Sequence, residues 1–252
     1  DVRLSDLEPS PRQETTTRVI NDALERFHYR KVALDDAFAE QIFETYLEAL
    51  DPNRSFFLKA DVDRFERQLR RLDDDLRDGK LDLGFEIFRT YRQRVDTRVE
   101  QALSLLDDGF EFDDQERYRF DRSEARWATT KGELDEIWRK RVKNDWLGLR
   151  LAKKNDDEIR GLLRKRYEGL GRRIRQFDSD DVFQSYVNAY TQSVEPHTSY
   201  MSPSTSENFD ISMRLSLEGI GAVLRAETEY TVVQRTIAGG PARQSGQIHG
   251  GD

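Results

Sequence analysis

The spacing of apolar residues changes once along this 252-residue chain, and the change limits which folds it can adopt. Up to about residue 194 apolar side chains recur every three or four positions, which predicts amphipathic helices. Beyond residue 210 they alternate, at Ile211, Met213, Leu215 and Leu217, which predicts a half-buried strand. We therefore expect a mainly α fold, with a multi-helix domain over 1–201, a polar linker over 202–210 and an incomplete β-rich domain over 211–252.

Helix start and stop signals divide the first part of the chain into about seven helical segments. We expect helices over 14–30, from Phe38 to Leu50, from Val62 to Leu76 with a stop at Gly79, from Phe85 to near Gly109, from the Thr130 capping box through Trp146, from Asn155 through Phe177, and from a Ser179 cap to before Pro196. Val19 and Phe27 belong to the expected apolar face of the first helix. Residues 1–12 are predicted to be an extended arm, and 110–126 a loop with short turns.

Two of these helix ends have similar sequences. Asp51-Pro52 follows the second predicted helix and Glu195-Pro196 follows the last, and each pair is followed by a Ser and then an aromatic residue. Proline cannot continue a helix because it lacks the backbone N–H and its ring clashes with the preceding turn. We expect two helix-terminating turns whose aromatic side chains fold back onto the helices.

The composition excludes several classes of partner and chemistry. The formal net charge of -8 comes from 49 acidic and 41 basic residues, so no basic field is available to hold phosphate backbones, and nucleic acid is not an expected partner. The absence of cysteine excludes disulfides, a thiol nucleophile and a thiolate metal site. No apolar run is long enough for a membrane span.

Metal and cofactor sites are not predicted. The three histidines, His28, His197 and His249, have no metal-ligand partner three or four positions away. Asp61, Asp63 and the run 73–75 lack the Gly and the terminal Glu of a calcium loop, so we interpret them as solvated helix faces. The three tryptophans, Trp127, Trp138 and Trp146, are interpreted as core or inter-helix packing, although an exposed one would suit a partner surface.

A glycine-containing loop is the candidate binding site. Gly219 and Gly221 lack Cβ atoms, so the backbone there can take a positive φ or approach a ligand closely, and successive N–H groups can point at one anion. We name Gly219, Ile220, Gly221 and Ala222 as a candidate carboxylate-binding loop, with the contacts made by backbone N–H groups. Two glycines in an ordinary hairpin are the simpler alternative. A nucleotide site is excluded because no third glycine and no helical pattern follow.

The residues that follow the loop predict two further local elements. The segment 230–234 is β-branched and aromatic, which favours a second strand. Gly239-Gly240-Pro241 then predicts a loop and a helical turn that begins at proline and stops at Gly246.

These motifs resemble the carboxy-terminal processing proteases, and in particular the tail-specific proteases of Gram-negative periplasms. The Gly219–Ala222 loop and the Gly240-Pro241-Ala242 segment resemble those of a protease PDZ domain. The segment 195–203, followed by 216–223, resembles the same proteases, and 51–57 is similar to the N-terminal region of the family. The resemblance implies a periplasmic serine endopeptidase whose PDZ domain captures substrate C-termini by strand addition. It also implies an adaptor protein that docks on the helices.

The family's catalytic Ser and Lys lie beyond the PDZ domain, and this sequence reaches only into that domain at Asp252. We therefore assign no catalytic residue here and expect the chain to be inactive by itself. No serine lies in a Gly-x-Ser-x-Gly elbow. The alternative is a non-catalytic helical scaffold that carries a PDZ-like peptide-binding module, and a Ser and a Lys beyond residue 252 would separate the two.

Overall fold

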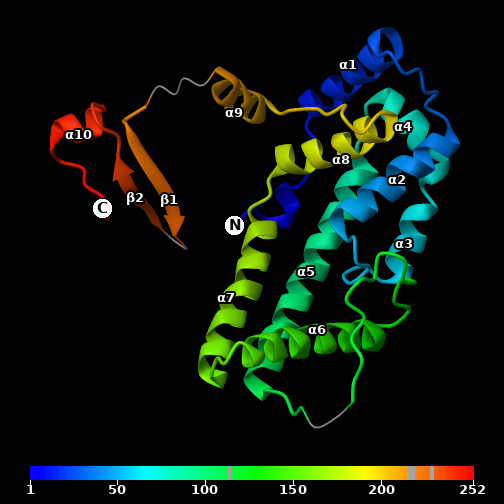
Figure 1. Cartoon of the computed structure of the whole chain (residues 1–252). Helices are drawn as coiled ribbons and strands as arrows, with labels where there is room; N and C mark the ends of the chain where they lie inside the picture. Colours follow the sequence, from blue (N-terminus) through cyan, green and yellow to red (C-terminus); the bar gives the residue numbers. More distant parts are fainter. Residues whose placement is uncertain (113–114, 215–218, 228–229) are drawn as a thin grey trace. The chain divides into compact units, whose positions relative to one another are not determined.

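The computed structural model of the chain describes all residues except 113–114, 215–218 and 228–229 (Figure 1). It divides into two compact units, Asp1–Tyr200 and Met201–Asp252. Among the described residues the first unit is helical, with one isolated bridge between Leu58 and Ala128, and the paired strands lie in the second unit. The predicted mainly α class, with strands only after residue 210, is confirmed.

The described helices of the first unit mostly begin and end where local signals place them. In chain order they are η1 (Leu4–Asp6), α1 (Pro11–Phe27), α2 (Asp36–Leu50), α3 (Lys59–Glu66), η2 (Leu69–Arg71), α4 (Leu72–Asp78), α5 (Asp82–Asp108), α6 (Lys131–Leu151), α7 (Asp156–Arg175) and α8 (Ser179–Val194). Thr130 accepts the Glu133 amide at the start of α6, and Asn155 forms a capping box with Glu158 at the start of α7. Gly79 ends α4 with a φ of 81°.

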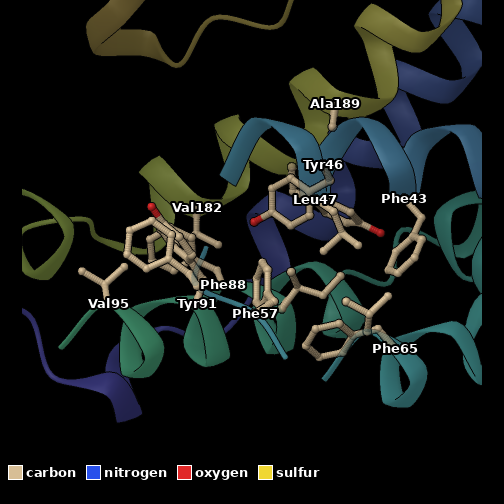
Figure 2. Close-up of a cluster of buried hydrophobic side chains, with 14 of the residues drawn as sticks. Phe43, Tyr46, Leu47, Phe57, Phe65, Phe88, Tyr91, Val95, Val182 and Ala189 are labelled. Carbon is tan, nitrogen blue, oxygen red and sulfur yellow. The ribbon is translucent and has the colours of Figure 1, made fainter. Parts of the chain in front are cut away.

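Helix α5 is the centre of this unit. It contacts α3, α6, α7 and α8, while α2 packs on α8 and α1 on α4; in Figure 1, α5 runs beside α7 and α6 crosses their ends. Figure 2 shows Tyr46 and Leu47 of α2 in one aromatic-rich cluster with Phe57, Phe65 and Phe88. Trp138 and Trp146 are fully buried, as expected, whereas Trp127 is only partly buried.

Close packing at Gly84 of α5 gives a stability prediction. A Cβ atom on Gly84 would lie 2.3 Å from Cδ1 of the buried Tyr186 ring, so Gly84→Ala must displace that ring. We expect Gly84→Ala to lower the free energy of unfolding by about 1–3 kcal/mol. Gly148→Ala on α6 is the matched control, because its Cβ would meet nothing within 4 Å and it should raise stability by up to about 1 kcal/mol. Denaturant unfolding of both variants checks this, and equal stabilities would contradict it.

Both predicted helix-terminating turns are confirmed. After α2 the carboxylate of Asp51 accepts the backbone N–H groups of Ser55, Phe56 and Phe57 at 2.8, 2.8 and 3.0 Å. After α8 the carboxylate of Glu195 accepts the N–H of His197 at 2.9 Å. The following aromatics return to the helices: Phe56 and Phe57 are buried, and the Tyr200 ring lies 5.2 Å from that of Phe183.

Several expectations for the helical unit were wrong. Residues 1–12 are not an extended arm, because Leu7 is buried, η1 lies within them and a Ser10 capping box starts α1 at Pro11. Val19 and Phe27 are 62% and 84% exposed rather than buried. The helix predicted over 62–76 is broken into α3, η2 and α4. The cap of α8 is Asp178, whose side chain accepts two amides, rather than Ser179.

Asp61 was also misassigned as part of a solvated face. It is buried, and Arg94 donates from Nε and Nη2 to its two carboxylate oxygens at 2.8 and 2.9 Å. The Leu58 amide donates to it at 3.0 Å. Asp63, in contrast, is about half exposed and pairs with Lys59, as expected of a surface residue.

The second unit begins with a helix rather than a strand. Helix α9 spans Pro203–Arg214, so most of the polar stretch expected as a linker is helical and the strand predicted at Ile211 and Met213 is wrong. Ser202 accepts the Thr205 amide and Pro203 is the first helical residue, and these start signals outweigh a short alternation. The other two positions of that alternation, Leu215 and Leu217, lie outside the described residues.

Two strands and a short helix complete the second unit. Strands β1 (Ala222–Glu227) and β2 (Tyr230–Thr236) pair antiparallel, with an irregularity between Val223 and Leu224. Helix α10 (Pro241–Ser245) begins at proline and ends at Gly246, as predicted. Among the described residues of the second unit, the buried apolar side chains are those of Val233 and Ala242. The core of this unit is therefore small.

Candidate functional site

The candidate loop 219–222 leads directly into β1. Gly221 has a φ of 73°, a left-handed conformation that favours glycine. A Cβ atom on Gly221 would lie 2.9 Å from Cα of Gly240, so the two backbones touch. The predicted positive φ is confirmed at Gly221, whereas the close approach seen there is to Gly240 of the same chain and the predicted approach to a ligand stays a prediction.

Gly219 differs from Gly221 in its surroundings. A Cβ atom on Gly219 would meet nothing within 4 Å among the described atoms, and its φ lies outside the left-handed range. The special backbone conformation that the sequence predicts for both glycines is therefore observed at Gly221 and not at Gly219.

Residues 237–242 form two backbone hydrogen bonds with the loop. The Ile237 amide donates to the Gly221 carbonyl at 2.8 Å, and the Ala242 amide donates to the Ile220 carbonyl at 2.7 Å. The carbonyls of Ile220 and Gly221 are thereby directed toward this segment. In the described part of the chain, the Ile220 and Gly221 amides have no backbone acceptor. Successive backbone N–H groups without acceptors can form an anion-binding concavity.

The two edges of the small sheet differ. Beside β2, the Gly251 amide donates to the Val233 carbonyl and the Val233 amide donates to the Asp252 carbonyl, both at 2.8 Å. In the described residues β1 pairs with β2 alone, so its other edge is open. An open edge presents backbone donors and acceptors that can pair with an added strand.

The loop and β1 each carry an exposed apolar side chain. Ile220 is 53% exposed and Leu224 is 52% exposed. In β1, Ala222 and Leu224 lie on one face because side chains alternate along a strand. The loop thus combines two amides that have no backbone acceptor in the described chain with exposed apolar side chains in the loop and in β1.

The remaining polar candidates lie elsewhere. His28 contacts the Thr198 hydroxyl through Nε2 at 3.0 Å, and His197 pairs with Glu195 at 2.7 Å, so both histidines lie at the turn that ends the helical unit. That pairing raises the pKa of His197 and lowers that of Glu195. Sequence spacing could not indicate the contact between positions 28 and 198. Within the described residues no group of three metal-binding side chains comes together, and no helix there is long and apolar enough to cross a membrane.

Comparison with known proteins agrees with the architecture. Residues 20–204 match the family model "Tail specific protease N-terminal domain". The chain is 38% identical over 244 residues to a protein of Haemophilus influenzae named tail-specific protease. That alignment covers 96% of this chain and 35% of the relative, so the chain spans about a third of the relative's length. The chain belongs to the tail-specific protease family, and its helical unit corresponds to the N-terminal domain of that family.

Proposed function

We propose that this chain is the substrate-recognition and regulatory portion of a periplasmic serine endopeptidase, and that its second unit is the first part of a PDZ domain that captures protein C-termini. The arrangement of loop 219–222 is the observation that carries the proposal. Its Ile220 and Gly221 amides lack backbone acceptors in the described chain, and the open edge of β1 follows at once.

Capture would proceed by strand addition. A substrate tail pairs its backbone with the free edge of β1, and its terminal carboxylate accepts the amides of Ile220, Gly221 and Ala222. A nonpolar last side chain then meets Ile220 and Leu224, which are otherwise half exposed. The backbone supplies the charge recognition, and the side chains select an apolar tail.

Dependence on a free carboxylate tests this proposal. In the complete protein we expect a labelled peptide with an apolar, free C-terminus to bind at least about tenfold more tightly than the same peptide with an amidated C-terminus, because charge-assisted hydrogen bonds are lost. Fluorescence anisotropy of the two peptides gives both affinities. Equal affinities would mean that the loop is a plain turn.

Peptide-bond cleavage is assigned to a Ser nucleophile and a Lys base outside these 252 residues, as in the activated-serine variants that use lysine. We expect the isolated chain to show no turnover of a peptide with an apolar C-terminus. A fluorogenic peptide assay, with inhibitor controls for contaminating proteases, measures this. Turnover that persists in those controls would contradict the assignment.

The helical unit has a second role in the proposal, as the docking surface for an adaptor protein. Its exposed apolar side chains are compatible with this role, since Phe27 and Tyr29 are 84% and 80% exposed. Docking on the helices and tail capture by the loop use separate units of the chain, so each can be tested without the other.

A further inference from the structure

A pocket of 480 Å³ opens on the helical unit, bordered by α2, by α3 and η2, and by residues 123–127. Its lining includes the buried Phe43 and Leu47 of α2, which we call the pocket floor, and the partly exposed Leu69 and Trp127. Pockets of this volume accept a few side chains or a small ligand. The tail-binding loop belongs to the other unit, so this pocket is a separate feature.

The pocket is bordered by carboxylates. Glu40, Glu44 and Glu48 of α2 line one side, and Glu66 and Glu124 line others. Of these five glutamates, Glu66 forms an ion pair, with its Oε2 atom 3.7 Å from Nζ of Lys59. For the other four, no Lys or Arg partner lies within ion-pair distance among the residues that the structure describes.

The cationic side chain in the pocket lining already contacts two neighbouring residues. Of the described residues that line it, Arg54 alone is cationic. Its guanidinium donates to the Ala125 carbonyl at 2.7 Å and lies 5.3 Å from the centre of the Trp127 ring. Since these partners are neutral, Arg54 keeps its charge, but the five glutamates outnumber it and the described lining is net negative beside its apolar residues. A ligand that complements it must be cationic and must also carry an apolar group.

The spacing of the carboxylates narrows the choice of ligand. Glu40, Glu44 and Glu48 are four residues apart on one helix, so neighbouring carboxylates are separated by about 6 Å and the row spans about 12 Å. Lys or Arg at every fourth position of a second helix has the same spacing. An apolar residue on that helix, beside the basic row, would face the apolar part of the pocket lining, which includes Phe43 and Leu47. A small cation would engage only part of the row.

We propose that this pocket docks a basic amphipathic helix of a partner protein, with its Lys or Arg side chains against Glu40, Glu44 and Glu48 and an apolar side chain on the pocket floor. The inference deepens the docking role proposed for the helical unit and rests on it, but it is independent of tail capture. Because the contacts are largely electrostatic and exposed, binding should weaken as salt is raised.

The test uses the complete protein and a synthetic helical peptide of about 16 residues with Lys at every fourth position and a Leu row beside it. A scrambled peptide of the same composition and spermine are the comparison ligands. The variant Glu44→Gln/Glu48→Gln removes two charges from the rim. Its matched control, Glu100→Gln/Glu168→Gln, removes two charges from α5 and α7 at residues that have no ion-pair partner in the described chain and do not line the pocket.

Isothermal titration should show the helical peptide binding more tightly than the scrambled one, and the rim variant should weaken it by about fivefold to tenfold. The control variant should change its affinity less than twofold. Equal effects of the two variants, equal binding of the scrambled peptide, or spermine binding as tightly as the peptide would each overturn the proposal. Gly221→Val should leave this affinity unchanged, which distinguishes failure here from failure of tail capture.

Discussion

Gly221→Val in the complete protein should weaken binding of an apolar, free C-terminal peptide by at least about a hundredfold. The new Cβ would lie 2.9 Å from Cα of Gly240, and valine strongly disfavours the φ of 73° at this position. Both effects force the loop to move and misdirect the Ile220 and Gly221 amides. Losing two charge-assisted hydrogen bonds at about 1.5–3 kcal/mol each accounts for this loss of affinity.

Gly246→Val is the matched control for this variant. Gly246 also has a positive φ, of 65°, but its Cβ would meet nothing within 4 Å. It ends α10, so valine there should lower stability through backbone strain while tail affinity stays within about threefold of wild type. Anisotropy titrations of both variants supply the comparison. If the two valine variants bind the peptide equally well, Gly221 has no special part in tail binding.

The largest expected effect on stability is at Asp51. Asp51 is 1% exposed, and its carboxylate accepts three backbone amides. Burial raises the pKa of this carboxyl, while those amide bonds oppose the shift. Trp138 also donates from Nε1 to the carbonyl of Ser55 in the same turn, at 2.6 Å. Asp51→Ala leaves three buried donors without an acceptor, at about 1–3 kcal/mol each, so we expect a loss of at least about 3 kcal/mol in the free energy of unfolding.

Asp63→Ala provides the comparison for Asp51→Ala. Asp63 lies nearby in sequence, and its side chain is 46% exposed and paired with Lys59, so its removal should cost less than about 1 kcal/mol. Thermal unfolding should place Asp51→Ala about 6–12 °C below wild type, at about 2–4 °C for each kcal/mol in a unit of this size. A difference of less than about 1 kcal/mol between the two variants would show that the turn does not depend on its carboxylate.

Local signals predicted much of the helical unit correctly. Gly79 ends α4 and Asn155 with Glu158 starts α7 because capping involves residues only a few positions apart. The same locality explains the correct prediction of the Asp51 and Glu195 turns. At α9 the local start signals, the Ser202 cap and Pro203 after it, specify the helix more strongly than the short apolar alternation specifies a strand.

Contacts between distant residues were not predictable from spacing. Asp61 is buried because Arg94, 33 positions away, pairs with it. Phe27 fits the apolar stripe of α1 by period, yet it is 84% exposed, because a period shows which residues share a face and not whether another element covers that face.

In the candidate loop, too, the backbone conformation was predictable from neighbouring residues, whereas the contacts with residues distant in sequence were not. Its glycines predicted a special backbone, and Gly221 has one. The carbonyl contacts from Ile237 and Ala242 depend on how the chain returns after β2, which no local pattern specifies. The pocket beside α2 was likewise unpredicted, because Trp127 and Glu124 come from a loop more than 70 residues after that helix.

A crystal structure of the complete protein with a bound peptide that ends in an apolar residue tests the central claim most directly. The account predicts the terminal carboxylate within about 2.7–3.2 Å of the backbone nitrogens of Ile220, Gly221 and Ala222, with the peptide paired along the free edge of β1. A peptide bound elsewhere, or a carboxylate that faces solvent while loop 219–222 stays empty, would contradict it.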